Sequence, residues 1–326
     1  MNLKVSRLCF GSLCMGPLQS DMPVEDGARV ISCALRCGVN FIDTAQIYGT
    51  YPYIKAALAG NPDKDKIIIS TKTYAHTRKL AKDALDGALR GLGRDAVDIF
   101  LLHEQESVHN IYGHIEALEY LFEQKRAGAI KAVGISTHHV AGVSGAVEFN
   151  RTYNRNDKLE VIHPIFNMAG LGIITGDPEG RGGTKVSQME DALAEAQRSG
   201  FFIFTMKPLG GGNLFASAGE ALGFVLDKPY IGSVAVGMKS ELEVLANVNF
   251  FETGRFTGEY YKNYLEGAGR KRLHIDGWCD GCGKCAAACP AEALEISGGR
   301  AVCDAGKCVL CGYCSGRCGG FAIKII

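Results

Sequence analysis

Three consecutive pieces of sequence decide the fold: KIIIST (residues 66–71), AKDALDGALRGL (81–92) and VDIFLL (97–102). The first and last are short apolar runs rich in β-branched residues, which is typical of strands buried in a parallel sheet. The middle piece has one apolar face with a period near 3.6, formed by Ala81, Ala84, Leu85, Ala88 and Leu92. That period predicts an amphipathic helix, so this stretch is a strand–helix–strand unit.

The same alternation extends over the first 250 residues. Apolar runs predict strands at residues 8–11, 40–43, 66–71, 97–102, 129–135, 159–162, 201–206 and 233–236. Helical stripes between them include Ile115, Leu118, Leu121 and Phe122, and Met189, Ala192, Leu193 and Ala196. Eight strand–helix units predict an α/β fold, the (β/α)₈ TIM barrel. A doubly wound sheet is the alternative, but it would want a G-x-G-x-x-G after the first strand, where none occurs.

Length, charge and the distribution of apolar residues argue against nucleic-acid binding and membrane association. The 326 residues suffice for one barrel and a small extra module. Lys plus Arg and Asp plus Glu both number 35, so no basic footprint for nucleic acid is present. Neither a signal-type segment nor a run of about 20 apolar residues occurs, so we expect a cytoplasmic protein without membrane association.

Eight of the thirteen cysteines form two runs near the end of the chain, Cys279-x₂-Cys282-x₂-Cys285-x₃-Cys289-Pro290 and Cys308-x₂-Cys311-x₂-Cys314-x₃-Cys318. A shift of 29 residues superposes one run on the other, which predicts a module with pseudo-twofold symmetry. Clustered cysteines in a cytosolic chain favour metal over disulfides, and two-residue gaps let one tight loop direct three thiolates at the same cluster. Zinc bound by C-x₂-C pairs is the alternative.

These runs resemble those of bacterial two-cluster ferredoxins, small α+β domains with two [4Fe–4S] clusters. In that family three close cysteines hold one cluster and the fourth crosses to the other. The resemblance implies one cluster on Cys279, Cys282, Cys285 and Cys318, and a second on Cys308, Cys311, Cys314 and Cys289. Cys303 lies outside both motifs and is expected to be a small buried residue.

Three polar residues fall at the carboxyl ends of successive predicted strands, where TIM barrels carry their catalytic groups. They are Asp43, Lys72 and His103, and Tyr48 follows Asp43 by five residues. Taken singly, such residues are ordinarily a turn residue, a surface lysine or packing. Together they form a constellation suited to proton transfer.

This constellation resembles that of the aldo/keto reductase family, as do the fragments FIDTAQIYG (41–49) and MKPLGGG (206–212). The resemblance covers roughly residues 3 to 250. It implies hydride transfer from a nicotinamide to a carbonyl carbon, with Tyr48 as proton donor. Lys72 would lower the pKa of Tyr48, Asp43 would hold Lys72, and His103 would orient the carbonyl.

The resemblance also implies positions for the nicotinamide cofactor. Ser136 and His163 would contact the nicotinamide, although the family usually has Asn after the serine, where Thr137 stands, and Gln at the position of His163. Lys207, Leu209 and Gly211 would lie near the pyrophosphate. Ser240, in a capping-box pattern with Glu243, would contact a phosphate or would only cap its helix, and Asn247 would lie near the adenine. An arginine typical of NADP enzymes is replaced near Glu243, with Lys239 the nearby cation, so both NADP and NAD remain open.

We therefore predict a barrel at residues 1–250, a connecting segment at 251–275 and a ferredoxin-like domain at 276–326. The basic run at residues 270–272 is expected to be solvated surface, and the Gly-rich loop at 167–184 has no predicted role. The predicted function is reduction of a carbonyl compound, or oxidation of an alcohol, with electron exchange through the clusters to an external carrier protein. The alternative is an iron–sulfur electron-transfer protein whose barrel binds another substrate or is a scaffold, with the tail as a docking module.

Overall fold

The structure is a computed structural model that describes residues 4–153, 156–176, 183–259, 262, 271–289, 291–308, 310 and 312–326. Eight parallel strands close into a barrel in chain order. They are β1 (Leu8–Gly11), β2 (Phe41–Asp43), β3 (Ile68–Thr73), β4 (Val97–Leu102), β5 (Ile130–Thr137), β6 (Val161–Pro164), β7 (Phe202–Met206) and β8 (Ser233–Gly237). The predicted TIM barrel is confirmed, and β1 pairs with β8 to complete it.

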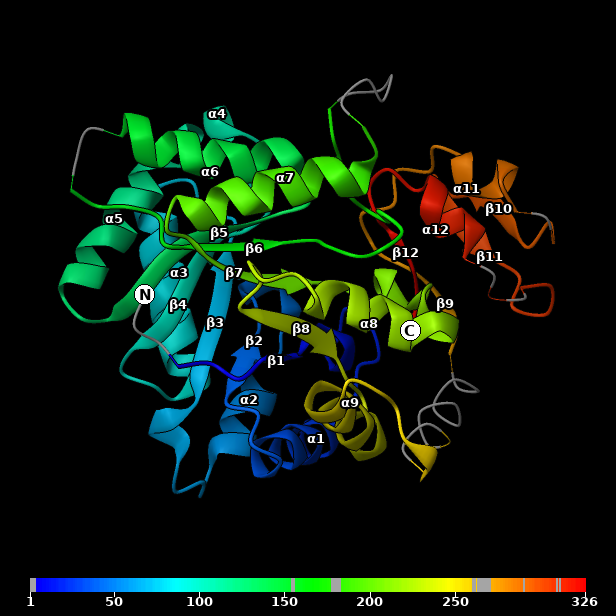
Figure 1. The fold of residues 1–326 in the computed structure, drawn as a ribbon, viewed down its shortest axis with the longest axis horizontal. Coiled ribbons are helices and arrows are strands. Elements are labelled where there is room, and N and C mark those ends of the chain that lie inside the picture. Colours follow the sequence, from blue (N-terminus) through cyan, green and yellow to red (C-terminus); the bar gives the residue numbers. More distant parts are fainter. Residues whose placement is uncertain are drawn as a thin grey trace.

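Helices surround this barrel (Figure 1). They are α1 (Val24–Arg36), α2 (Tyr51–Leu58), α3 (Arg78–Leu92), α4 (Val108–Gly113), α5 (Ile115–Arg126), α6 (Val140–Thr152), α7 (Lys185–Arg198), α8 (Ala218–Leu226) and α9 (Glu241–Thr253). The predicted stripe of α3 is buried along its whole length, from Ala81 to Leu92. A separate apolar cluster, which includes Phe41, Leu101 and Phe204, fills the barrel interior, so the barrel is a packed core.

The C-terminal module is built from two small antiparallel ladders and two short helices. Strand β9 (Leu273–Ile275) pairs with β12 (Ile323–Ile325), and β10 (Leu294–Ser297) pairs with β11 (Arg300–Cys303). Helices α11 (Lys284–Ala287) and α12 (Tyr313–Arg317) each follow a glycine with positive φ, Gly283 and Gly312, at corresponding positions of the repeat. The module thus has the α+β composition predicted for it.

Two elements cross the boundaries expected from the sequence. Helix α9 runs past residue 250 because its apolar side, which includes Phe250, continues to pack on the barrel. Strand β9 lies inside the segment expected to be a connection, but its hydrogen-bonded ladder with β12 makes it part of the module.

The module lies against the barrel beside α8 and the loops that follow β6 and β7 (Figure 1). The Asn213 amide donates a hydrogen bond to the Ser315 hydroxyl over 2.8 Å. The Phe321 ring packs against Gly172, and a β-carbon at either Gly172 or Gly212 would collide with module atoms. The two parts therefore meet in a specific, closely packed interface. Within the described part of the chain, no helix is long and apolar enough to cross a membrane.

Candidate active site

A buried ion pair between Lys72 and Asp43 lies at the base of the site. The Lys72 ammonium donates to both carboxylate oxygens of Asp43, over 2.8 and 2.7 Å, and to the Thr44 carbonyl over 2.7 Å. These three bonds use all the hydrogens of the ammonium. Burial raises the pKa of Asp43, and the charge of Lys72 opposes that rise.

Tyr48 ends a short 3-10 helix (Gln46–Tyr48) that follows β2, and its ring centroid lies 5.0 Å from the Lys72 ammonium. The expectation that Lys72 lowers the pKa of Tyr48 is wrong for this structure. Burial, with smaller effects of Asp43 and Glu104, raises the pKa of Tyr48 well above its ordinary value.

His103 follows β4 and faces Tyr48. The two ring centroids are 5.7 Å apart in an edge-on arrangement, and Tyr74 stacks on the other side of His103 at 4.4 Å. Burial, then the charges of Lys72 and Lys207, lowers the pKa of His103 well below its ordinary value, so the ring is neutral. Its Nδ1 atom has no hydrogen-bond partner among the described residues. The four predicted catalytic residues are thus brought together.

Ser136 and His163 are register neighbours on β5 and β6. The Ser136 hydroxyl is fully buried and accepts the Glu104 N–H over 3.0 Å. His163 Nε2 lies 3.7 Å from Asp43 Oδ2, and His163 Nδ1 has no partner within the described chain. Burial and the charge of Lys72 lower the pKa of His163, which keeps this ring neutral as well.

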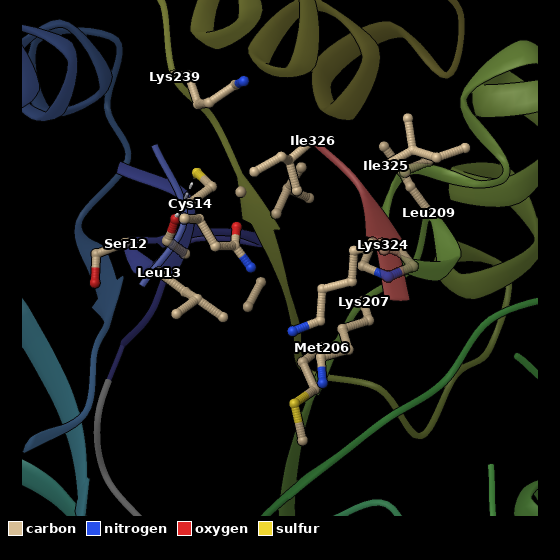
Figure 2. Close-up of a pocket in the computed structure, with 18 of the residues that line it drawn as sticks. Ser12, Leu13, Cys14, Met206, Lys207, Leu209, Lys239, Lys324, Ile325 and Ile326 are labelled. Atoms are coloured by element: carbon tan, nitrogen blue, oxygen red, sulfur yellow. Dashed lines mark hydrogen bonds between the residues drawn. The ribbon is translucent and has the colours of Figure 1, made fainter. Parts of the chain in front are cut away.

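A cavity of about 1040 Å³, a volume that includes the solvent at its open mouth, extends from Asp43, Tyr48 and His163 to the start of α9. Its wall runs from Asp43, Tyr48 and His163 past Met206, Lys207, Leu209 and Gly211 to Lys239, Glu243 and Asn247. Figure 2 shows Lys239 at one end, with Lys207 and Lys324 toward the other. Because the lining extends from the Tyr48 end to the Lys239 end, one elongated ligand could contact both ends.

At the Lys239 end, Ser240 is the N-cap of α9 and accepts the Glu243 N–H over 3.1 Å. The returning half of the expected capping box differs, because the Glu243 carboxylate accepts the Lys239 N–H over 2.7 Å. The Asn247 amide nitrogen donates to the Glu243 carbonyl, which leaves Asn247 Oδ1 buried without a partner among the described residues.

Lys271 is a cavity residue that the sequence did not reveal. Its ammonium lies 3.5 Å from Glu243 Oε1 and 4.7 Å from the Phe215 ring centroid. Arg272 donates to the Gln19 carbonyl. The expectation that the basic run is solvated surface is therefore wrong for Lys271, whereas Arg272 is exposed as expected and residue 270 lies outside the described chain. The place of Lys271 could not be predicted, because its partner Glu243 is more than 20 residues away along the chain and such a contact leaves no local sequence pattern.

Lys207 is held in a strained position. Its φ is +57°, its ammonium lies 2.8 Å from His138 Nε2, and it lies 4.4 Å from the Phe321 ring centroid. Burial, followed by the charge of Lys324, lowers the pKa of Lys207 to about 7. Phe321, Lys324 and Ile325 also line the cavity, so the module supplies part of its wall.

The cysteines of the module gather in two sets. Cys279, Cys285 and Cys318 lie close enough to influence one another electrostatically, and Cys282 is exposed on the same loop. Cys289, Cys308 and Cys314 line a second, small cavity, and Cys311 lies outside the described residues. Cys303 is not an isolated buried residue, because its thiol is hydrogen-bonded to Cys308.

Backbone groups point at several of these sulfurs. The N–H groups of Ala301, Ala322 and Ala293 donate to the sulfur atoms of Cys279, Cys318 and Cys289, over 3.4, 3.2 and 3.3 Å. Such bonds stabilise the thiolate form that iron–sulfur clusters require. They therefore favour the thiolate form at Cys279, Cys318 and Cys289.

The polar mouth of the barrel and the cysteine-rich module packed against it both match known families. Residues 7–220 match the Aldo/keto reductase family, and residues 274–295 match the 4Fe-4S binding domain. The chain belongs to the aldo/keto reductase family.

Similar proteins agree with this assignment. The chain is 26% identical to an aldo-keto reductase of Mycobacterium sp. (strain MCS), over 48% of this chain and 57% of that one. It is also 26% identical to the methylglyoxal reductase DkgA of Yersinia pestis, over 45% and 53%. It thus spans little more than half the length of these curated relatives.

Solved structures show the same fold. The holo form of an aldo-keto reductase from Bacillus halodurans has a TM-score of 0.58 at 23% identity, and covers 81% of this chain and 92% of its own. The apo form of that protein has a TM-score of 0.57. At this identity the likeness concerns the barrel fold.

Proposed function

We propose that this protein reduces a small carbonyl compound, or oxidises the corresponding alcohol, with NADP or NAD bound in the cavity. The observation that carries the proposal is the Lys72–Asp43 pair buried directly beneath Tyr48 and His103. When bound, the reduced nicotinamide supplies a hydride to the carbonyl carbon. Tyr48 supplies the proton to the carbonyl oxygen, which completes the alcohol.

The four residues around the carbonyl would have different roles in the reaction. The raised pKa keeps Tyr48 protonated at neutral pH, so its hydroxyl is ready to donate. Asp43 keeps Lys72 charged and fixed beneath the Tyr48 ring. Neutral His103 presents a ring nitrogen as a hydrogen-bond partner for the substrate oxygen and so fixes its orientation.

The cavity fits the dinucleotide because it is long and carries unpartnered polar atoms at both ends, His163 Nδ1 and Asn247 Oδ1. Ser136 and His163 would hold the nicotinamide end. Lys207, Leu209 and Gly211 would lie along the pyrophosphate, Ser240 would contact a phosphate, and Asn247 would lie near the adenine. Lys239 and Lys271 favour a phosphate on the ribose, whereas Glu243 favours free hydroxyls, so the choice of NADP or NAD stays open.

We also propose two [4Fe–4S] clusters in the module, which would exchange electrons with an external carrier protein. Cys279, Cys282, Cys285 and Cys318 would hold one, and Cys308, Cys311, Cys314 and Cys289 the other. The backbone N–H bonds to the Cys279, Cys318 and Cys289 sulfurs support this ligation. When bound, the clusters supply one-electron chemistry. The functional division would be a barrel at residues 1–250 and a cluster domain at 276–326, joined by a segment at 251–275 whose ends are the last turn of α9 and strand β9 of the module.

A second candidate function is favoured by the presence of Phe321 and Lys324 in the cavity wall. In that case the clusters would feed electrons singly to a different substrate in the barrel. Anaerobic addition of NADPH separates the candidates. Carbonyl reduction without bleaching of the cluster absorbance supports the first, and cluster-driven turnover without nicotinamide supports the second.

Tyr48→Phe tests the proton-donor role. The variant keeps the ring above Lys72 but lacks the hydroxyl, so we expect kcat for carbonyl reduction to fall at least about 100-fold, as is typical when a general acid is lost. The Kd for NADPH, measured by fluorescence, should change little. Tyr51→Phe is the matched control, because the Tyr51 hydroxyl bonds to Thr71. Full activity of Tyr48→Phe would refute the assignment.

A further inference from the structure

The two halves of the module contain the same turn after their last cysteine. The Phe321 N–H donates to the Cys318 carbonyl over 3.1 Å, and the Glu292 N–H donates to the Cys289 carbonyl over 3.2 Å. Both residues have positive φ, +51° and +48°. A shift of 29 residues superposes Glu292 on Phe321, so the repeat supplies its own internal comparison.

The surroundings of these equivalent turns differ sharply. Glu292 is exposed, whereas Phe321 is only 1% exposed and lines the barrel cavity. The Phe321 ring lies 4.4 Å from the Lys207 ammonium and 5.8 Å from the His138 ring centroid. One half of the module therefore presents its turn to the barrel and the other presents its turn to solvent.

The barrel is shaped to receive the Phe321 ring. A β-carbon at Gly172 would collide with this ring, and one at Gly211 would lie 3.1 Å from its Cζ atom. Lys207 reaches the ring from a backbone with φ of +57°, a conformation that costs free energy and persists where surrounding contacts enforce it. The packing of the Phe321 ring against the barrel is therefore specific.

We propose that this turn couples the cavity to the cluster on Cys279, Cys282, Cys285 and Cys318, and leaves the other cluster uncoupled. Phe321 is the positioning residue, and Lys207 is the charge through which the cavity acts. The inference rests on the proposed cluster ligands. It goes beyond the proposed function because it gives the two clusters different roles. The cluster on the set with Cys318 would respond to the cavity, and the cluster on the set with Cys289 would exchange electrons with the external carrier.

The physical reason is electrostatic. A cation held in a water-poor site stabilises the more negative, reduced form of a nearby cluster, and its effect falls with distance and with intervening water. Lys324, six residues after Cys318, also lines the cavity and forms an ion pair with Asp276. Figure 2 shows Lys324 and Lys207 together, well separated from Lys239.

The test compares Lys207→Gln with Lys239→Gln in the full-length, anaerobically purified protein. Both variants remove one cavity charge, but at opposite ends. Midpoint potentials of the two clusters are measured by potentiometric titration with EPR detection, without nucleotide or substrate. We expect Lys207→Gln to lower the potential of one cluster only, and Lys239→Gln to change neither.

Four further variants identify the cluster that responds and test whether the response depends on Phe321. In Cys282→Ala, which removes a ligand of the coupled cluster, the remaining cluster should not respond to Lys207→Gln. In Phe321→Ala the response of the coupled cluster to Lys207→Gln should shrink, because water enters between charge and cluster, whereas Glu292→Ala should leave the response unchanged. Phe321→Leu keeps the site apolar, so most of the response of the coupled cluster to Lys207→Gln should remain.

Several results would overturn the inference. They are equal shifts of both clusters, no shift in Lys207→Gln, a matching shift in Lys239→Gln, or a loss of the response in Glu292→Ala instead of Phe321→Ala. Iron and sulfide analysis comes first, and fewer than two clusters would refute the ligand assignment and this inference together. A failure of nicotinamide binding or carbonyl reduction would leave these potentials unaffected, so the two failures are distinguishable.

Discussion

At the scale of single residues, the site depends on charges that the protein holds away from water. Lys72 is fully buried, and Asp43 and the Thr44 carbonyl accept three hydrogen bonds from its amino group. Lys207 is different, because in the described chain no carboxylate forms an ion pair with it and a neutral histidine is its hydrogen-bond partner. A buried charge without a counterion is costly, which points to a role in ligand binding or coupling.

The cost of Lys207 should appear as pH-dependent stability. Its pKa is about 7 in the folded protein and about 10.4 in an unfolded chain, so between these values the unfolded state binds the extra proton and stability rises with pH. Lys207→Met removes the cost. The free energy of unfolding should increase by up to about 5 kcal/mol at pH 6, and by about 2 kcal/mol at pH 9.

Urea denaturation under anaerobic conditions measures this effect. Lys64→Met is the control, because Lys64 is exposed and should show the same small change at both pH values. An equal effect of Lys207→Met at pH 6 and pH 9 would show that Lys207 titrates like an ordinary lysine.

At the scale of elements, a single close approach fixes how the module lies on the barrel. Gly212 has a φ of +90°, and a β-carbon there would collide with the Ile325 carbonyl of β12. Gly212→Ala should therefore lower the free energy of unfolding by about 1–3 kcal/mol. It should also speed amide hydrogen exchange in β12.

Gly223→Ala is the matched control for that variant. Gly223 lies within α8, and a β-carbon there would meet no atom within 4 Å. Because alanine favours helix over glycine, Gly223→Ala should leave stability unchanged or slightly higher. Unaltered exchange in Gly212→Ala would show that the contact with β12 does not hold the module.

The barrel elements were predictable from the sequence because their signals are local. The strands lie within two residues of the predicted runs, and the α3 stripe from Ala81 to Leu92 is buried as its period indicated. β9 was missed because three residues carry too little periodicity, and only pairing with β12 defines it. Local pattern also misassigned Lys271, whose partner Glu243 lies on α9.

At the scale of the whole molecule, the module forms part of the cavity wall as well as carrying its cysteines. The order of Asp43, Tyr48, Lys72 and His103 along the chain was enough to predict that they meet, since successive barrel strands end at the same mouth. The place of Phe321 could not be predicted, because nothing in either repeat half says which one faces the barrel. The raised pKa of Tyr48 could not be predicted from the sequence either, because it depends mainly on burial and then on the nearby charge of Asp43.

The central claim is that hydride passes directly from a nicotinamide to a carbonyl carbon above the Lys72–Asp43 pair. The most direct measurement is anaerobic turnover of methylglyoxal and 4-nitrobenzaldehyde as probes, with NADPH or NADH carrying deuterium at the transferring position of C4. Mass spectrometry should find one deuterium on the carbinol carbon of the alcohol from the native protein. Product that lacks this deuterium, formed while the clusters are oxidised, would contradict the account.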